Sequence, residues 1–142
     1  MKKIIALDFD GVLHPRTPSS SSQMFQGINV LASAIAGLND VQIVIDSTWR
    51  QFPSDLTWAL DRFPTNVSSQ IAGSTPILGT KSHRELEILS WLQEHGFSVS
   101  QLLILDDEPH LFDVLAANVY LVNGDCGLMP TDAEMIRRIL TS

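Results

Sequence analysis

The sequence predicts an α/β fold, a doubly wound parallel sheet with helices on both faces. Four short apolar runs are rich in branched residues and lack polar alternation, which is typical of strands buried on both sides. They are residues 4–7, 41–45, 102–105 and 119–122. Helical patterns separate these runs, so strand and helix alternate along the chain. Because the 142 residues match the usual size of one domain, we expect a single domain over 1–142.

The first two helices follow from an apolar stripe and from a start and a stop signal. The stripe that predicts the first helix consists of Val30, Leu31, Ala34, Ile35 and Leu38. Ser54 is suited to cap a short second helix, which Pro64 must follow rather than continue. A weaker apolar run at 67–71 then predicts a fifth strand.

The later helices are marked by capping boxes, in which an N-cap Ser or Thr is followed three residues later by an acidic residue. These pairs are Ser82 with Glu85 and Thr131 with Glu134. The first pair predicts a helix running to about His95, where Gly96 is suited to end it. Pro109 fits the first turn of a further helix. The serine-rich stretch 15–27 predicts a mobile loop, either a flap over the strand ends or an uninvolved surface loop.

The composition limits the classes of partner. Sixteen acidic residues against nine basic ones give a net charge of −7, and Lys and Arg form no strip that would follow a phosphate backbone. We therefore expect no extensive contact with duplex nucleic acid, although one local cation site can still bind a terminal phosphate. The only cysteine, Cys126, cannot form an internal disulfide, and no apolar run is long enough to span a bilayer. The sequence thus predicts a cytoplasmic protein without a membrane partner.

Acidic residues follow three of the predicted strands, at the point where each strand ends. They are Asp8 and Asp10, then Asp46, then Asp106 and Asp107. Because the carboxyl ends of parallel strands meet at one edge of a sheet, we expect these side chains to lie together. Two charges about 5 Å apart repel by roughly 3 kcal/mol at an effective dielectric of about 20, so a cation must offset them. Carboxylate oxygens suit Mg²⁺, which we predict as the cofactor. The candidate ligands are Asp8, Asp10, Asp106 and Asp107.

The same residues predict phosphoryl transfer to an aspartate. This reaction needs a nucleophilic carboxylate, an acid for the leaving group and groups that neutralise the phosphoryl oxygens. Asp8 is the candidate nucleophile, and Asp10 is placed to protonate the leaving oxygen and then to activate water. Backbone amides around Gly11, the Ser47 hydroxyl and the Lys81 ammonium are candidates for holding the phosphoryl oxygens. Further candidates for substrate contacts are Thr48, Arg84 and His14.

These residue groups resemble, in order, the four motifs of the haloacid dehalogenase superfamily. The matching segments are 4–12 (IIALDFDGV), 43–47 ending in Ser47, a basic residue at Lys81 or Arg84, and 103–107 ending in an acidic pair. The resemblance implies a phosphatase, with either Lys81 or Arg84 as the third-motif cation. In members with an acidic pair the second residue usually takes the metal. The resemblance therefore favours Asp107 over Asp106 as the direct ligand, although the two could exchange roles.

Further details resemble the small lidless domain of Swiss Army Knife RNA repair proteins. They are Leu13-His14-Pro15, Ser47-Thr48-Trp49-Arg50, Arg84-x-x-Glu87-Ile88-x-x-Trp91-Leu92 and Gly127-Leu128. The predicted elements fill the gaps between the motifs and leave no segment for a lid domain. The resemblance covers nearly the whole chain and implies removal of a terminal phosphate from a nucleotide or polynucleotide. Asp46 is a departure, because the family more often has a small or hydroxyl residue there.

Other hypotheses of function compete with the phosphatase. A dehalogenase is disfavoured by Asp10, and a phosphomutase by the missing lid. A receiver-like binding domain would also be acidic and phosphorylated on aspartate, but its acidic pair would follow the first strand and its acceptor a later one. This sequence has the opposite order. A catalytically silent domain that binds phosphate or metal is the remaining alternative.

Overall fold

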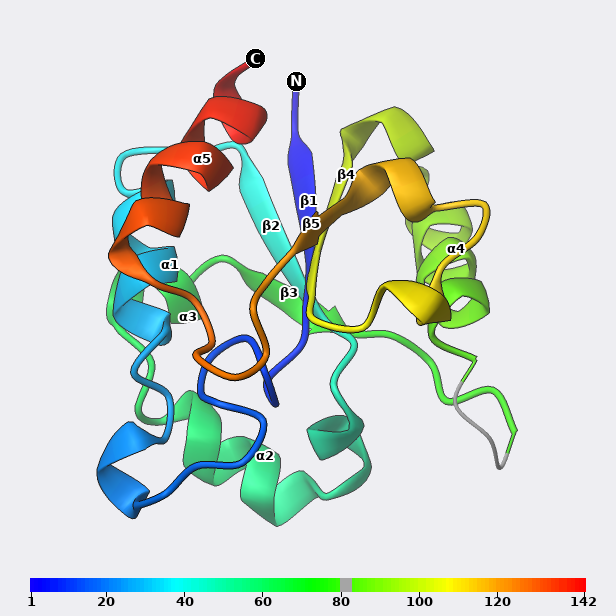
Figure 1. The fold of residues 1–142 in the computed structure, drawn as a ribbon. Helices are drawn as coiled ribbons and strands as arrows, with labels where there is room; N and C mark the ends of the chain where they lie inside the picture. Colours follow the sequence, from blue (N-terminus) through cyan, green and yellow to red (C-terminus); the bar gives the residue numbers. More distant parts are fainter. Residues whose placement is uncertain (80–82) are drawn as a thin grey trace.

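The computed structural model describes residues 1–79 and 83–142 and shows a five-stranded parallel sheet with helices packed on it (Figure 1). The strands are β1 (Lys3–Leu7), β2 (Val41–Ile45), β3 (Ile71–Ser74), β4 (Leu102–Asp106) and β5 (Val119–Leu121). The helices are α1 (Ile28–Ile35), α2 (Pro53–Leu60), α3 (Thr65–Ser68), α4 (Arg84–His95) and α5 (Pro130–Thr141). The predicted cation Lys81 and the predicted cap Ser82 lie outside the described residues.

The central strand of the sheet is β1, in the strand order β3-β2-β1-β4-β5. Ile5 is aligned with Ile43 of β2 on one side and with Leu103 of β4 on the other. The chain first builds the sheet out to β3 and then returns to the other side of β1. The order of strands therefore reverses beside β1, and ligands bind at the carboxyl ends of strands at such a point. In Figure 1 these ends point downward, away from the two termini.

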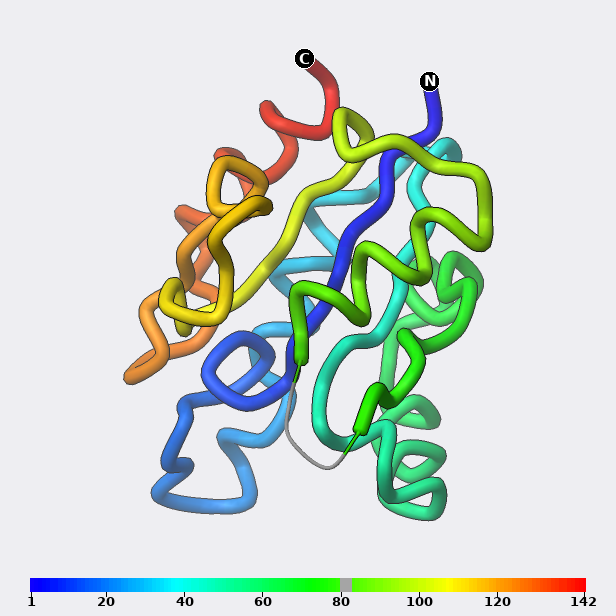
Figure 2. Tube along the Cα trace, turned by 90° about the vertical axis from the view of Figure 1, so that its right-hand side faces the viewer, coloured from blue at the N-terminus to red at the C-terminus, as the bar shows by residue number. Residues whose placement is uncertain are grey.

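Successive side chains of β1 point to opposite faces of the sheet and enter two separate apolar clusters. Ile5 and Leu7 pack in the larger cluster, which α1 and α5 cover, whereas Ile4 and Ala6 pack in the smaller one, which α4 covers. Figure 2 shows α4 lying along one face of the sheet, with α1 behind it. The predicted doubly wound fold is confirmed, and burial on both faces explains the uniformly apolar strands. Among the described residues, no helix is both long and apolar enough to cross a membrane.

Two predictions after β2 need correction. The predicted fifth strand is present but lies later in the chain, because Val67 belongs to α3 and the strand begins only at Ile71. Val67 is fully buried in the larger cluster, so its apolar character reflects a helix packed on the core. Ser54 does not cap α2. Phe52 is the N-cap, and Pro53 takes the first helical position, where its missing N–H sacrifices no hydrogen bond.

The start of α5 also differs from its prediction. The helix begins after Met129, and the Asp132 carboxylate accepts a hydrogen bond from the Met129 N–H at 2.7 Å. The predicted pair of Thr131 and Glu134 is therefore wrong, and the exposed Glu134 instead pairs with Arg138 along the helix.

The other helix signals have mixed outcomes. Pro109 begins only a 3₁₀ turn that ends at Leu111, so the predicted helix is absent from this described segment. The Glu85 carboxylate accepts hydrogen bonds from the amides of Asp113 and Leu115, and the N-cap of α4 is His83. The predicted end of α4 is confirmed, since Gly96 follows His95 in the left-handed conformation at φ 75°.

The loop 15–27 contains a short 3₁₀ turn and then returns to the core at Phe25. The Phe25 ring is buried and lies 5.1 Å from the ring of His14 and 5.4 Å from that of Trp49, between ring centroids. The far end of the loop is therefore fixed to the same apolar cluster as the strand ends. Its role as a flap stays a prediction.

Candidate active site

Three carboxylates meet at the carboxyl edge of the sheet. Asp8 follows β1, Asp106 is the last residue of β4, and Asp107 comes directly after it. Each offers an oxygen atom that lies within 4.8 Å of the others. Asp10 was expected to share this metal group, but the structure does not gather it with the other three. The strand ends have therefore brought together three of the four predicted metal ligands.

A buried arginine supplies the positive charge of this cluster. Arg84 is the first residue of α4, and its Nη1 lies 3.0 Å from Asp106 Oδ2 and 3.3 Å from Asp8 Oδ2. Burial lowers the pKa of Arg84, but the charges of the surrounding carboxylates outweigh this and raise it. Of the two predicted phosphate-binding cations, Arg84 lies at the site, and the structure does not describe Lys81.

Asp46 adds a further carboxyl group to the surroundings of Arg84. This residue, the departure from the family pattern, is completely buried. Neither of its carboxyl oxygens has a hydrogen-bond partner among the described residues. Burial raises the pKa of Asp46 to about 7, with the charge of Asp106 adding to the rise and those of Arg84 and Arg50 opposing it. Asp46 is therefore a buried carboxyl group next to the site whose ionised form is disfavoured.

The Asp46→Asn variant is expected to be more stable than the wild type at pH 8 by a few kcal/mol, since each pKa unit corresponds to about 1.4 kcal/mol. The folded protein holds the Asp46 proton up to a pH of about 7, whereas the unfolded chain releases it near the ordinary aspartate pKa of 3.8. Wild-type stability therefore falls as the pH rises through this window, and the variant lacks this contribution. Urea unfolding of both proteins at pH 4 and pH 8 measures the difference. Equal stabilities at pH 8 would contradict the expectation.

The surroundings of Asp8 favour the binding of a cation. Burial raises the pKa of Asp8 well above its usual value; Arg84 opposes the rise, while the charges of Asp46 and Asp106 add to it. The Phe9 N–H donates to Asp8 Oδ1 at 2.9 Å and favours the ionised form. A divalent cation beside these oxygens would shift the balance further toward the carboxylate.

Asp10 has different surroundings from the other carboxylates. Its side chain is 49% exposed, and its Oδ1 lies 2.7 Å from His14 Nε2 and 3.3 Å from Trp49 Nε1. The hydrogen bond with His14 lowers the pKa of Asp10, aided by Trp49, although partial burial acts in the other direction. His14 was predicted to touch substrate. The structure leaves its side chain only 1% exposed and places it behind Asp10 rather than in the cavity.

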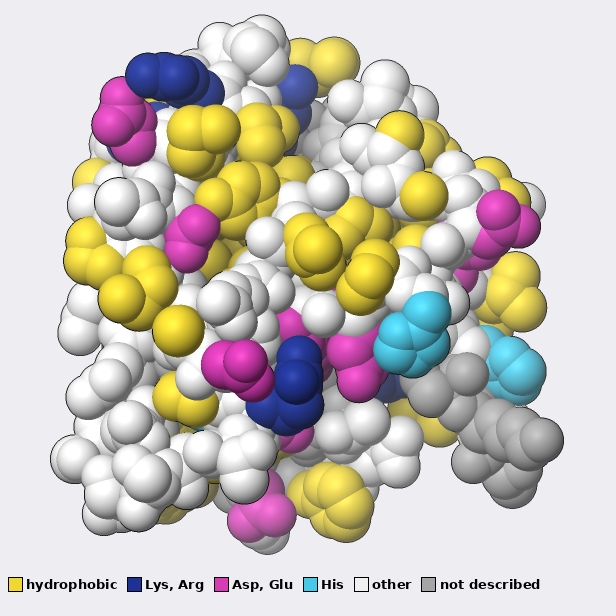
Figure 3. Space-filling view, in the orientation of Figure 1, with side chains coloured by type: hydrophobic (Ala, Val, Ile, Leu, Met, Phe, Trp, Pro, Cys, Tyr) yellow, Lys and Arg dark blue, Asp and Glu magenta, His cyan; other side chains and the backbone are white. Residues whose placement is uncertain are grey.

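A cavity of about 170 Å³ opens over these groups. Its lining residues are Asp8, Asp10, Arg16, Thr48, Arg84, Asp107 and Glu108. Thr48 is therefore at the predicted place. Ser47 is not, because it is fully buried and its hydroxyl accepts a hydrogen bond from the Trp49 N–H at 3.2 Å. Figure 3 shows acidic and basic side chains gathered in the lower middle of the face, below the strand ends.

Two lining residues, Glu108 and Arg16, were not predicted from the sequence. Arg16 lies in the serine-rich loop and donates from Nε and Nη2 to Asp107 Oδ2 at 2.9 and 2.7 Å. Gly11 faces the same carboxylate with φ +79°, and a Cβ there would come within 2.2 Å of Asp107 Oδ2. A Cβ at Gly124 would collide with Asp107 and Arg16. Both glycines therefore leave room for Asp107 and its partner.

Behind the cavity, a buried ion pair joins the segments that form its walls. Arg50 Nη2 lies 2.7 Å from Glu87 Oε1, and Arg50 Nη1 donates to the carbonyl oxygens of Asp46 and Ser47. Glu87 Oε2 accepts a hydrogen bond from the Leu78 N–H at 2.9 Å. The loop after β2, the segment after β3 and helix α4 are thus held to one another.

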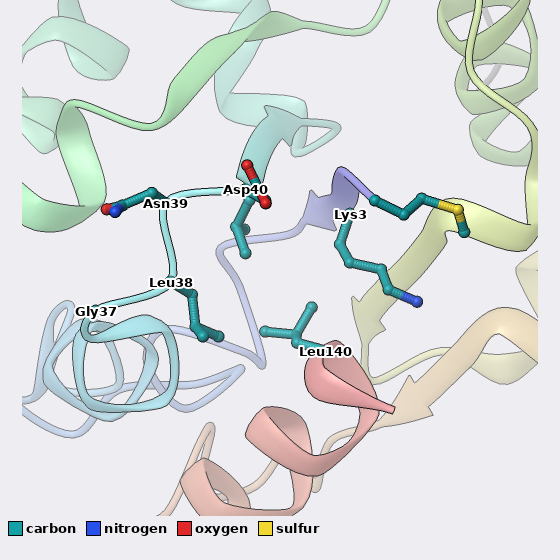
Figure 4. A pocket seen from close by; sticks show the side chains of 8 residues that line it. Lys3, Gly37, Leu38, Asn39, Asp40 and Leu140 are labelled. Carbon is teal, nitrogen blue, oxygen red and sulfur yellow. The ribbon is translucent and has the colours of Figure 1, made fainter.

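A second cavity, of about 340 Å³, lies at the opposite end of the sheet (Figure 4). It is lined by Met1, Lys3, Leu140 and the turn 37–41 before β2. Lys3 and Asp40 are its only charged side chains among the described residues. It contains no converging carboxylates, and we place the candidate site at the carboxyl edge.

A Rossmann-like sheet with this acidic cluster beside its central strand is typical of haloacid dehalogenase-type domains. This class of protein has phosphatase-type function. A family model described as the HAD domain in Swiss Army Knife RNA repair proteins matches residues 4–133. The chain belongs to this family. The predicted resemblance is therefore confirmed. Searches of curated proteins and of solved structures found no match.

Proposed function

We propose that the chain is a Mg²⁺-dependent phosphomonoesterase that forms an aspartyl phosphate on Asp8 and acts on a terminal phosphate of a nucleotide or polynucleotide. The observation that supports this most is the position of Asp8. It lies at the floor of a small cavity, with the acidic pair of β4 and the cation of Arg84 beside it. A nucleophile, a metal-binding group and a charge for the phosphoryl oxygens are therefore adjacent.

The donor set fits Mg²⁺, because Asp8 and the acidic pair offer only oxygen. Asp106 is the more heavily engaged member of the acidic pair, because its Oδ1 accepts from the Glu108 N–H and its Oδ2 from Arg84. Arg16 donates only to Oδ2 of Asp107, which leaves Oδ1 of Asp107 for a metal. We therefore assign direct ligation to Asp8 and Asp107. When bound, the metal would neutralise charge on the phosphate. Asp10 is assigned to proton transfer, since its carboxylate lies outside the acidic group.

The reaction has two steps on the residues of this site. A carboxylate oxygen of Asp8 attacks phosphorus, the bond from phosphorus to the leaving oxygen breaks, and Asp10 gives that oxygen a proton. Because the hydrogen bond with His14 lowers the pKa of Asp10, Asp10 takes this proton from the monoprotonated phosphate ester when the substrate binds. Water then attacks phosphorus and passes a proton back to Asp10, and the bond from Asp8 to phosphorus breaks to release phosphate. Arg84 is placed to stabilise the phosphoryl oxygens. The amides expected to help it are already engaged, since the Phe9 N–H donates to Asp8 Oδ1 and the Gly11 N–H to the His14 carbonyl. The buried Ser47 would have to move to take part.

The size of the cavity supports a substrate that protrudes from a larger molecule. Its volume of about 170 Å³ is below the roughly 300–1,000 Å³ of pockets that enclose small molecules. It has room for a phosphate group but not for a whole nucleotide. No cap domain is found in the described ranges 1–79 and 83–142. Both observations favour a terminal phosphate whose carrier remains outside.

Phosphate release tests this proposal. The purified protein with Mg²⁺ is incubated with 3′-phosphorylated oligonucleotides, nucleoside monophosphates, sugar phosphates and 4-nitrophenyl phosphate, with an EDTA-treated sample as control. We expect release that depends on the metal and is fastest with the oligonucleotide ends. No release from any ester would contradict the proposal. A long-lived phosphoprotein formed from acetyl phosphate without turnover would instead support a receiver-like domain.

A further inference from the structure

The carboxylate of Asp10 is held at one oxygen by donors from two separate segments. His14 Nε2 lies 2.7 Å and Trp49 Nε1 lies 3.3 Å from the same atom, Oδ1. The first donor comes from the turn after β1, closed by the Gly11 N–H bond to the His14 carbonyl at 2.9 Å. The second comes from the 3₁₀ turn Thr48–Gln51 after β2. Oδ2 has no such partner among the described residues.

Burial fixes His14 in this arrangement. Its ring packs edge-on against Phe25, and its Nδ1 is buried with no hydrogen-bond partner among the described residues. A proton on Nδ1 would be a buried donor without an acceptor, which costs about 1–3 kcal/mol. The tautomer with its hydrogen on Nε2 is therefore favoured over the tautomer with its hydrogen on Nδ1, and the Nε2 hydrogen points at Asp10. Trp49 packs against Phe9 and Phe25, so its indole N–H is also held in place.

We propose that His14 and Trp49 are positioning residues that hold Oδ1 of Asp10 so that Oδ2 alone exchanges protons with substrate and water. The inference rests on the proposed function. A carboxyl group rotates broadly about its last torsion. If either oxygen could face the substrate, the carboxyl group would spend less time in the orientation that allows proton transfer. With Oδ1 occupied, the Oδ2 proton moves to the leaving oxygen as its bond to phosphorus breaks. A proton of the attacking water returns to Oδ2 in the second step.

The test compares leaving groups, because a positioned acid matters most where the leaving oxygen needs a proton. Values of kcat/KM are measured for a 3′-phosphorylated oligonucleotide, an alkyl ester, and for 4-nitrophenyl phosphate, whose oxygen leaves as a stable anion. His14→Phe and Trp49→Phe remove one N–H each but keep an aromatic ring, and His14→Gln restores a donor. Phe63→Leu is the packing control, since Phe63 lies in the same aromatic cluster and does not contact Asp10.

For His14→Phe we expect kcat/KM to fall about tenfold or more with the oligonucleotide and less than about threefold with 4-nitrophenyl phosphate, since a general acid contributes about 10²–10⁴-fold. Trp49→Phe should also lose more kcat/KM with the oligonucleotide than with 4-nitrophenyl phosphate, but its loss should be smaller. His14→Gln should recover part of the kcat/KM that His14→Phe loses. Phe63→Leu should affect both esters equally. Equal losses with both esters in His14→Phe would overturn the inference alone. A wild type inactive with both would overturn the proposed function, and the inference with it.

Nitrogen-15 NMR of the histidines tests the contact without any substrate. We expect one buried imidazole in its Nε2–H form, with a resonance that moves in Asp10→Asn and is absent in His14→Phe. A His14 signal from the Nδ1–H form, or one insensitive to Asp10→Asn, would overturn the inference even in an active enzyme. An Nε2–H signal that responds to Asp10→Asn supports it.

Discussion

The Asp8→Asn variant is expected to lose phosphate release by about 10⁴-fold or more, which is the scale on which removal of a nucleophile acts. The amide has the shape of the carboxylate but cannot attack phosphorus. Because the pKa of Asp8 is raised mainly by burial, removing its charge relieves a destabilising interaction. We therefore expect the unfolding free energy at pH 8 to be unchanged or increased. Steady-state phosphate release and urea unfolding measure the two effects.

The matched control is Asp113→Asn, the same substitution at an exposed residue before β5. It should keep both activity and stability. Release retained by Asp8→Asn at the wild-type rate would show that Asp8 is not the nucleophile. A loss of release accompanied by unfolding would contradict the stability expectation.

The Arg84→Met variant is expected to lose about 3–5 kcal/mol of stability at pH 8, the typical effect of removing one partner of a buried ion pair. The charges of Asp8, Asp46 and Asp106 would then lack their shared counter-ion. Without Arg84 the pKa values of these groups would rise further, so the loss should shrink at pH 5, where protonation removes the charges. Release of phosphate should fall about 10²–10³-fold, since a charge beside the phosphoryl oxygens is lost.

Urea unfolding at both pH values, with Arg84→Lys and Arg138→Met alongside, checks this expectation. Lysine keeps the charge but not the planar group, so an intermediate loss is expected. Arg138 forms an exposed pair with Glu134, and its replacement should cost less than about 1 kcal/mol. An Arg84→Met protein as stable as the wild type at pH 8 would contradict the assignment of Arg84 as the cation of the cluster.

The strands β1, β2 and β4 were predictable because a strand that is buried on both faces must be apolar almost throughout. The edge strand β5 is only partly buried, but its residues are also apolar. The strand β3 was not predictable, since its segment Ile71–Ser74 alternates partly buried and exposed residues and includes a glycine. Its pairing with β2 also shifts register between Ile43 and Val44. Such a strand depends on its neighbour more than on its own composition.

The capping errors have a different cause. The N-caps of α2 and α5 are the apolar residues Phe52 and Met129, and a proline follows each of them at the first helical position. At α5 the Asp132 carboxylate accepts from the amide of Met129, and Thr131 is an ordinary helical residue. A search for a Ser, Thr, Asp or Asn cap therefore places both helix starts too late.

The positions of the acidic residues at the site were predictable, but their burial and their contacts were not. Their positions at strand ends follow from the order of elements, whereas the complete burial of Asp46 depends on how α4 and the loops pack. Arg16 reaches Asp107 from a loop with no distinctive pattern. Contacts across such sequence distances leave no local signal, and the bond from Trp49 to Asp10 is another example.

The central position of β1 has a consequence for synthesis on the ribosome. One edge of β1 pairs with β2, and the other pairs with β4, where Ile4 lies beside Leu102. This second edge therefore has no hydrogen-bond partner until β4 has been made. At about 5–20 residues per second, that edge stays unpaired for roughly 5 to 20 s after β1 is made. A strand that is apolar from Ile4 to Leu7 and has an open edge can pair with other chains during that time. The nascent chain is therefore most exposed to aggregation before β4 emerges, and only then does the acidic pair join Asp8.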